Sequence, residues 1–129
     1  MSIIPGLVAL HEHTVADVDT AIALGSGDVP VLATPRIVAW AEAACVAALA
    51  DSATDAETTT VGTSVHLDHS GACGVGSAVR VRAELTAHEG RVLRFAVAVD
   101  DASGRVLATG ELTRVIVYRG RFLAGLASA

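Results

Sequence analysis

The clearest pattern in the chain is a run of Ala, Leu and Val residues in the segment 34–50. After Arg36 the only charge in this run is Glu42, so the segment predicts one long helix that is apolar almost all round. Thr34 is suited to cap the helix N-terminus, and Pro35 to occupy the first helical position. A helix of this kind has to be buried by something broad, such as a sheet that curves around it.

Alternation of hydrophobic and polar residues predicts strands on both sides of the helix. It is plainest between Val79 and Leu85, where Arg80 and Arg82 take polar positions. Strands are expected at residues 6–14, 61–69, 77–88, 91–100 and 105–119. The short links at 89–90 and 101–104 fit hairpins, so the strands that they join run antiparallel. This order predicts an α+β fold in which a curved antiparallel sheet wraps one helix, the hotdog fold.

Length and composition narrow the class of protein. With 129 residues, 52% of them hydrophobic and 18% charged, the chain fits one folded domain spanning residues 1–129. A net charge of −5 and the lack of a dense basic cluster argue against nucleic acid as a partner. No apolar run reaches the roughly 18 to 20 residues of a membrane span. Two cysteines outside any CxxC pattern, and no signal-peptide pattern, indicate a reduced, cytoplasmic protein.

Glu42 does not fit a plain core helix. Its helical neighbours three and four residues away are Val38, Ala39, Cys45 and Val46. Leaving an ionised carboxylate unpaired there costs several kcal/mol. Glu42 is therefore paired, made more basic than a free carboxylate by its apolar surroundings, or placed where the helix edge meets water. The second case suits a general base, whereas an ion pair with an Arg or an exposed margin is a structural role.

His69 and Arg114 also break the strand patterns. Strict alternation along 61–69 places His69 at the end of the helix-facing side and Gly62 on the opposite side. A lone His at such an end is more often a hydrogen-bonded boundary residue than a catalyst. Arg114 shares the apolar side of the last strand, where it lies at the sheet edge, counters Glu42, or binds a ligand phosphate or carboxylate.

Thr34 has two possible roles at one location. As an N-cap its hydroxyl contributes about 1 kcal/mol, and a buried helix N-terminus is also suited to a developing oxyanion. Eight residues separate Thr34 from Glu42, which is about 12 Å of helix rise. One small atom reaches both residues only if Thr34 lies on a loop that folds back over the helix.

Other His and Cys residues give weaker signals. Two pairs of polar strand residues could be read as metal ligands: His66 with Asp68, and His11 with His13. Two ligands are few for a metal, so no metal site is expected. Cys45 on the Ala-rich helix is most simply a small buried hydrophobe, and Cys73 could be exposed in a Gly-rich loop.

Three motifs carry a resemblance to a known family. They are Leu-Gly-Ser-Gly-Asp-Val-Pro-Val-Leu-Ala-Thr-Pro at 24–35, Glu-Ala-Ala-Cys at 42–45, and Val-Gly-Thr-Ser-Val at 61–65, which leads to His69. In this order and spacing the chain resembles the hotdog-fold thioesterases related to fluoroacetyl-CoA thioesterase, from roughly residue 14 to residue 122. The aromatic residues of the fluoroacetyl pocket have no counterpart in 28–33, so fluoroacetyl-CoA itself is not the expected substrate.

The resemblance implies a site and a partner. Thr34, Glu42 and His69 match the family's catalytic set, Gly62 matches a glycine associated with thioester binding, and Arg114 matches an arginine on the last strand. It also implies an acyl-CoA substrate, no metal or other cofactor, and a homodimer with the ligand at the subunit boundary.

These observations lead to one hypothesis and two alternatives. We expect an acyl-CoA thioesterase for a small acyl group, in which Glu42 acts as general base or nucleophile. His69 transfers protons and Thr34 orients the acyl group or the attacking water, while Arg114 meets the CoA arm. The alternatives are a noncatalytic acyl-CoA-binding module and, less favoured, a hotdog enoyl-CoA hydratase or dehydratase.

Overall fold

The computed structural model describes residues 3–52 and 55–127; the remaining residues of the expected domain 1–129 lie outside the described part. In chain order its elements are β1 (Val8–Thr14), the 3-10 turn η1 (Asp17–Asp19), α1 (Ala21–Leu24), α2 (Thr34–Ala48), β2 (Thr58–His69), β3 (Ala78–Glu89), β4 (Val92–Asp101), β5 (Val106–Tyr118) and α3 (Arg119–Ala127). The expected helix and strands are confirmed, with ends that differ by at most three residues.

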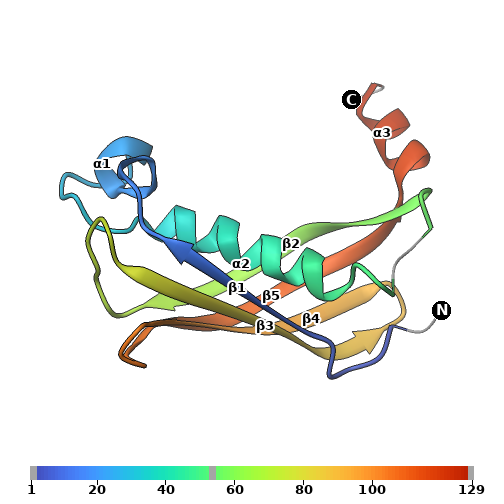
Figure 1. The fold of residues 1–129 in the computed structure, drawn as a ribbon. Coiled ribbons are helices and arrows are strands. Elements are labelled where there is room, and N and C mark those ends of the chain that lie inside the picture. Colours follow the sequence, from blue (N-terminus) through green and yellow to red (C-terminus); the bar gives the residue numbers. More distant parts are fainter. Residues whose placement is uncertain (1–2, 53–54, 128–129) are drawn as a thin grey trace.

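One curved sheet wraps α2. Within the described residues it has five strands in the order β1-β3-β4-β5-β2, and every neighbouring pair is antiparallel. Figure 1 shows α2 lying along the concave face of this sheet. The helix buries Ile37, Ala41, Ala44 and Cys45 against strand residues that include Leu85 and Phe95, and all six are 0% exposed. This shared core fixes the helix on the sheet, and the α+β architecture expected from the sequence is confirmed.

The opposite side of α2 is not covered in this chain. Ala39, Ala43 and Val46 are exposed, and Val46 retains 49% of its accessible surface. The sheet that was expected to bury this apolar helix therefore covers only one of its sides in the single chain.

Strand β2 forms an edge of the sheet and is irregular. It pairs with β5 on one side, and the register shifts between Gly62 and Ser64, so that Thr63 is an extra residue in the strand. Such a bulge reverses the alternation of side chains on its two sides. Residues before and after Thr63 therefore face the helix in opposite parity.

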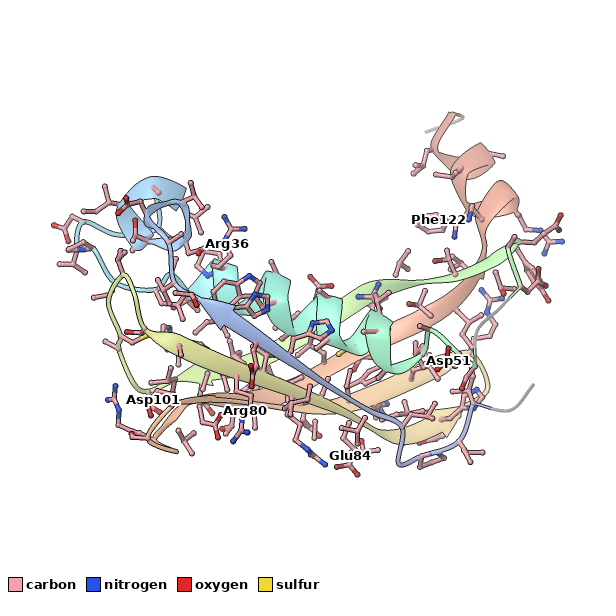
Figure 2. The ribbon with its side chains drawn as sticks, in the orientation of Figure 1. Arg36, Asp51, Arg80, Glu84, Asp101 and Phe122 are labelled. Atoms are coloured by element: carbon pink, nitrogen blue, oxygen red, sulfur yellow. The ribbon has the colours of Figure 1, made fainter. Side chains whose placement is uncertain are left out.

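The C-terminal helix α3 was not expected from the strand pattern. It follows β5 directly and projects away from the sheet (Figure 1). Phe122, labelled in Figure 2, and its neighbours Leu123 and Leu126 are all exposed. Among the described residues no helix is both long and apolar enough to cross a membrane.

Candidate active site

Thr34 and His69 meet at one end of the sheet. The Thr34 hydroxyl oxygen lies 2.7 Å from Nδ1 of His69, which makes a hydrogen bond between the first residue of α2 and the last residue of β2. His69 is half-buried and Thr34 is exposed. We call these two residues the Thr34–His69 pair. Its side chains supply a hydroxyl and an imidazole that are open to a ligand.

Thr34 is not the N-cap that the sequence indicates. Ala33 has extended backbone angles and is the N-cap, and its carbonyl accepts from the amides of Arg36 and Ile37 at 3.1 and 3.2 Å. The helix thus begins one residue earlier than expected, and Pro35 follows Thr34 inside its first turn. The Thr34 hydroxyl bonds to His69 instead of capping the helix.

Glu42 is paired with Arg114. Nη1 of Arg114 donates to Oε2 of Glu42 at 3.0 Å, while Nε and Nη2 donate to the hydroxyl and carbonyl oxygens of Thr60 at 2.9 and 3.0 Å. The Arg114 side chain is 9% exposed and that of Glu42 is 37% exposed. Two of the alternatives that the sequence left open for Glu42 are therefore both true. Glu42 is paired, and it also lies where the edge of the helix meets water. Of the options for Arg114, the geometry favours countering Glu42 over a contact with the CoA arm.

Gly62 lies directly against this ion pair. A Cβ atom built on Gly62 would collide with Oε2 of Glu42 and would lie 3.3 Å from Nη1 of Arg114. Gly62 therefore faces the helix, contrary to the strict alternation used above, because the bulge at Thr63 shifts the parity of the strand. A glycine here lets the carboxylate approach the backbone of β2 closely. We call Glu42, Thr60, Gly62 and Arg114 the Glu42 cluster.

Thr60 is the member of this cluster that the sequence reasoning missed. It lies in a run of three threonines at the start of β2, where one hydroxyl residue is not distinguishable from the next. It also lines a groove of about 480 Å³ between the end of α2 and the start of β2, which is lined on the other side by Val46 of α2 and by Leu49 directly after the helix. The Glu42 cluster thus adjoins a partly apolar groove.

The structure does not bring the two groups together in one chain. Thr34 lies in the first turn of α2 and does not fold back over it, so Glu42 is about 12 Å further along the helix axis. Along β2, Gly62 precedes His69 by seven residues, one of which is the bulged Thr63, so roughly 20 Å of strand separates them. A single thioester carbonyl cannot contact the Thr34–His69 pair and the Glu42 cluster of the same chain.

Neither cysteine has the features of a nucleophile. Cys45 is buried in the core, and burial raises the pKa of its thiol to about 12. Cys73 is half-buried rather than exposed, and burial likewise raises its pKa. Both are free thiols in the described part of the chain.

Of the other histidines, His13 packs against α2 and His66 is exposed. His13 stacks on Trp40 of α2 with ring centroids 4.0 Å apart. Burial lowers the pKa of His13, and the nearby His11 lowers it further. His66 and Asp68 lie 3.9 Å apart and are both about four-fifths exposed. Among the described residues, no group of three or more His, Cys, Asp or Glu side chains is arranged to hold a metal ion.

Comparison with known proteins places this geometry in a family. The family model of the fluoroacetyl-CoA-specific thioesterase FlK matches residues 15–120. A solved structure of FlK is 27% identical with a TM-score of 0.91, over 99% of this chain and 98% of that one. An FlK mutant solved with fluoroacetate and CoA is 28% identical with a TM-score of 0.84, over 93% and 99%.

A more distant structure shares the fold alone. A thioesterase-superfamily member from Thermus thermophilus is 23% identical, with a TM-score of 0.89 over 98% of this chain and 93% of that one. A search of curated protein sequences finds no match. The family match spans both the Thr34–His69 pair and the Glu42 cluster. The chain therefore belongs to the fluoroacetyl-CoA-specific thioesterase family and is a hotdog-fold thioester hydrolase.

Proposed function

We propose that this protein hydrolyses small acyl-CoA thioesters. The observation that carries the proposal is a partly exposed carboxylate, Glu42, which is held by the buried Arg114 and lies against the backbone of β2 at Gly62. The FlK mutant complex with fluoroacetate and CoA supports a CoA thioester as the substrate class. Residues 28–33 contain no aromatic side chain, which argues for an acyl group other than fluoroacetyl.

Each polar residue has a role in this reaction. Glu42 activates a water molecule as general base or attacks the thioester carbonyl itself. Arg114 fixes the carboxylate and balances its charge, and Gly62 lets the carboxylate lie against the backbone of β2. His69 delivers the proton that the departing CoA thiolate needs, and Thr34 orients His69 through their hydrogen bond.

The distance between the two groups calls for a second copy of the chain. Strand β2 is an edge strand, and its Val65 is 43% exposed. If two β2 strands pair antiparallel with Gly62 opposite His69, the two-fold axis passes through His66, because the bulge at Thr63 leaves six strand steps between Gly62 and His69. This register sets the Glu42 cluster of one protomer against the Thr34–His69 pair of its partner. Directly paired residues in a sheet are about 5 Å apart, which is close enough for one thioester to contact both groups.

The uncovered side of α2 supports the same arrangement. Ala39, Ala43 and Val46 form an apolar stripe of small side chains beside β2. Two such helices packed side by side would bury this stripe along with the β2 edges. We therefore propose a homodimer whose two active sites are each built from both protomers.

The test is thiol release from a panel of short, branched and aromatic acyl-CoA thioesters. Wild type is compared with Glu42→Gln and with the control Glu111→Gln, since Glu111 is an exposed carboxylate on β5. A blank accounts for the protein's own two thiols. The proposal predicts saturable release that is lost in Glu42→Gln and retained in Glu111→Gln.

Other outcomes would select another function. Tight acyl-CoA binding without turnover, unchanged in Glu42→Gln, would indicate a noncatalytic binding module. Addition of water to an enoyl-CoA without thiol release would indicate a hydratase.

A further inference from the structure

The loop 70–77, which follows His69, also touches the segment that leads into Thr34. The amide of Leu32 donates to the carbonyl of Cys73 at 2.9 Å, and Val31 forms a β-bridge with Gly74. Leu32 and the next residue directly precede Thr34. The loop thus links the two members of the Thr34–His69 pair through the backbone on both sides.

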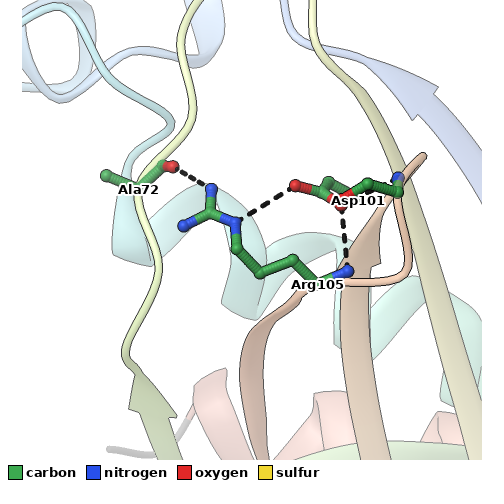
Figure 3. Close-up of polar contacts among 4 residues, drawn as sticks. Ala72, Asp101 and Arg105 are labelled. Atoms are coloured by element: carbon green, nitrogen blue, oxygen red, sulfur yellow. Dashed lines mark hydrogen bonds and ion pairs between the residues drawn. The ribbon is translucent and has the colours of Figure 1, made fainter.

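This loop has little intrinsic stiffness. Three of its eight residues are glycines, and it contains no proline. Its first part is held on β5, because the amides of Ser70 and Gly71 both donate to the carbonyl of Leu107, at 2.9 and 3.0 Å. Between this anchor and the contact at Cys73 stands Ala72, whose carbonyl points toward the β4–β5 hairpin (Figure 3).

Arg105 is the side chain that holds Ala72. Its Nη2 donates to the Ala72 carbonyl at 2.7 Å, and its Nε donates to Oδ2 of Asp101 at 3.2 Å (Figure 3). Asp101 is itself fixed, since its Oδ1 accepts from the amide and hydroxyl of Ser103 and from the amide of Arg105. These hydrogen bonds lower the pKa of Asp101 to about 2, so the carboxylate is ionised at neutral pH. A guanidinium with one nitrogen on a fixed carboxylate has a defined direction for the other nitrogen.

We propose that Arg105, oriented by Asp101, is a positioning residue for the Thr34–His69 pair. It fixes the carbonyl of Ala72 and through it the loop 70–77, so that His69 stays in hydrogen-bond reach of Thr34. Arg105 touches neither member of the pair and acts only through the loop. The effect on rate rests on the proposed function, whereas the effect on the loop does not.

Arg105 affects the geometry of the Thr34–His69 pair rather than the stability of the fold. The Arg105 side chain is 53% exposed, and an exposed ion pair adds little to the free energy of unfolding. The rate of proton transfer, in contrast, falls steeply when a catalytic group moves by about 1 Å. Loss of Arg105 should therefore lower turnover while leaving the fold intact.

The test compares Arg105→Ala, Arg105→Lys and the control Arg82→Ala. Arg82 also pairs with an acidic neighbour, Glu84, at 3.0 Å and is similarly exposed, but it lies on β3 away from the loop 70–77. We expect Arg105→Ala to lower kcat about tenfold with KM within about twofold of wild type. Arg105→Lys keeps one cationic donor and should restore part of kcat, and Arg82→Ala should match wild type.

Hydrogen exchange at the Leu32 amide gives a readout that needs no activity. In Arg105→Ala this amide should exchange at least about tenfold faster, because its acceptor on Cys73 moves, while core amides of β4 keep their rates. Unchanged exchange at Leu32 in Arg105→Ala would overturn the proposal, and so would a wild-type kcat in that variant or an equal loss in Arg82→Ala. Faster exchange at Leu32 in a protein without thioesterase activity would contradict the proposed function and leave the loop assignment standing.

Discussion

Replacing Arg114 with Met tests how the Glu42 carboxylate is held. Met fills a similar apolar volume, so the cavity contribution is small. The change removes three donors, one to Glu42 and two to Thr60. Losing one partner of a fully buried ion pair costs about 3–5 kcal/mol. The Glu42 side chain is 37% exposed and regains some hydration, so we expect a loss of about 2–3 kcal/mol in the free energy of unfolding.

A double-mutant cycle separates the ion pair from the rest of this effect. Glu42→Gln keeps an acceptor oxygen for Arg114 and should cost less than about 1 kcal/mol alone. In the double variant no carboxylate is left without its countercharge. Arg114→Met should therefore cost about 1 kcal/mol less in the Glu42→Gln background than in wild type.

The assay is equilibrium unfolding in urea at neutral pH for the four proteins of the cycle. Equal m-values are needed, so that midpoint differences report on stability. A free energy of unfolding within about 0.5 kcal/mol of wild type for Arg114→Met would refute the account of Arg114 as the group that holds Glu42. Strict additivity in the cycle would refute it as well.

Three further predictions follow from single contacts. Gly62→Ala should abolish thiol release while the chain still folds, because the new methyl displaces the Glu42 carboxylate; steady-state kinetics with circular dichroism as the folding control tests this. Cys45 should not react with a disulfide reagent in native protein at pH 8 and should react after unfolding, because burial raises its thiol pKa to about 12. Asp101→Asn should have a lower free energy of unfolding than wild type at pH 7, because the fold stabilises the ionised form of Asp101. This difference in stability should shrink as the pH falls from 3.8, the ordinary pKa of an Asp carboxyl, to about 2, the pKa of Asp101 in the folded protein. Urea unfolding of both proteins at pH 7 and at pH 2.5 measures the difference.

Most of the fold could be predicted from the sequence, because its helix and strands have distinct periods. The Ala-rich segment predicted α2, and the short hairpin links predicted the β3–β4 and β4–β5 pairs. The helix α3 was missed, because strand-like residues run directly into it and no turn signal marks its start at Arg119. The open side of α2 could not be foreseen, since hydrophobic periodicity does not say whether the cover comes from the same chain.

Only part of the candidate site could be predicted from the sequence. The residues Thr34, Glu42, His69 and Arg114 were each singled out, and the ion pair of Glu42 with Arg114 was among the alternatives. The side of the strand predicted for Gly62 was wrong, because the bulge at Thr63 reverses the alternation of side chains and leaves no clear mark in the sequence. Spacing on the helix did give the 12 Å separation, yet it could not show that Thr34 turns to His69 instead of capping α2.

The most direct test of the account mixes two inactive chains. The Glu42→Gln and His69→Ala variants, each expected to be inactive alone, are unfolded together, refolded and assayed for thiol release. If each site combines Glu42 of one protomer with His69 of its partner, a mixed dimer holds one intact site and one doubly defective site. With about half of the dimers mixed, activity should return to about a quarter of wild type. If the mixture stays as inactive as its two components, the two-protomer site is contradicted.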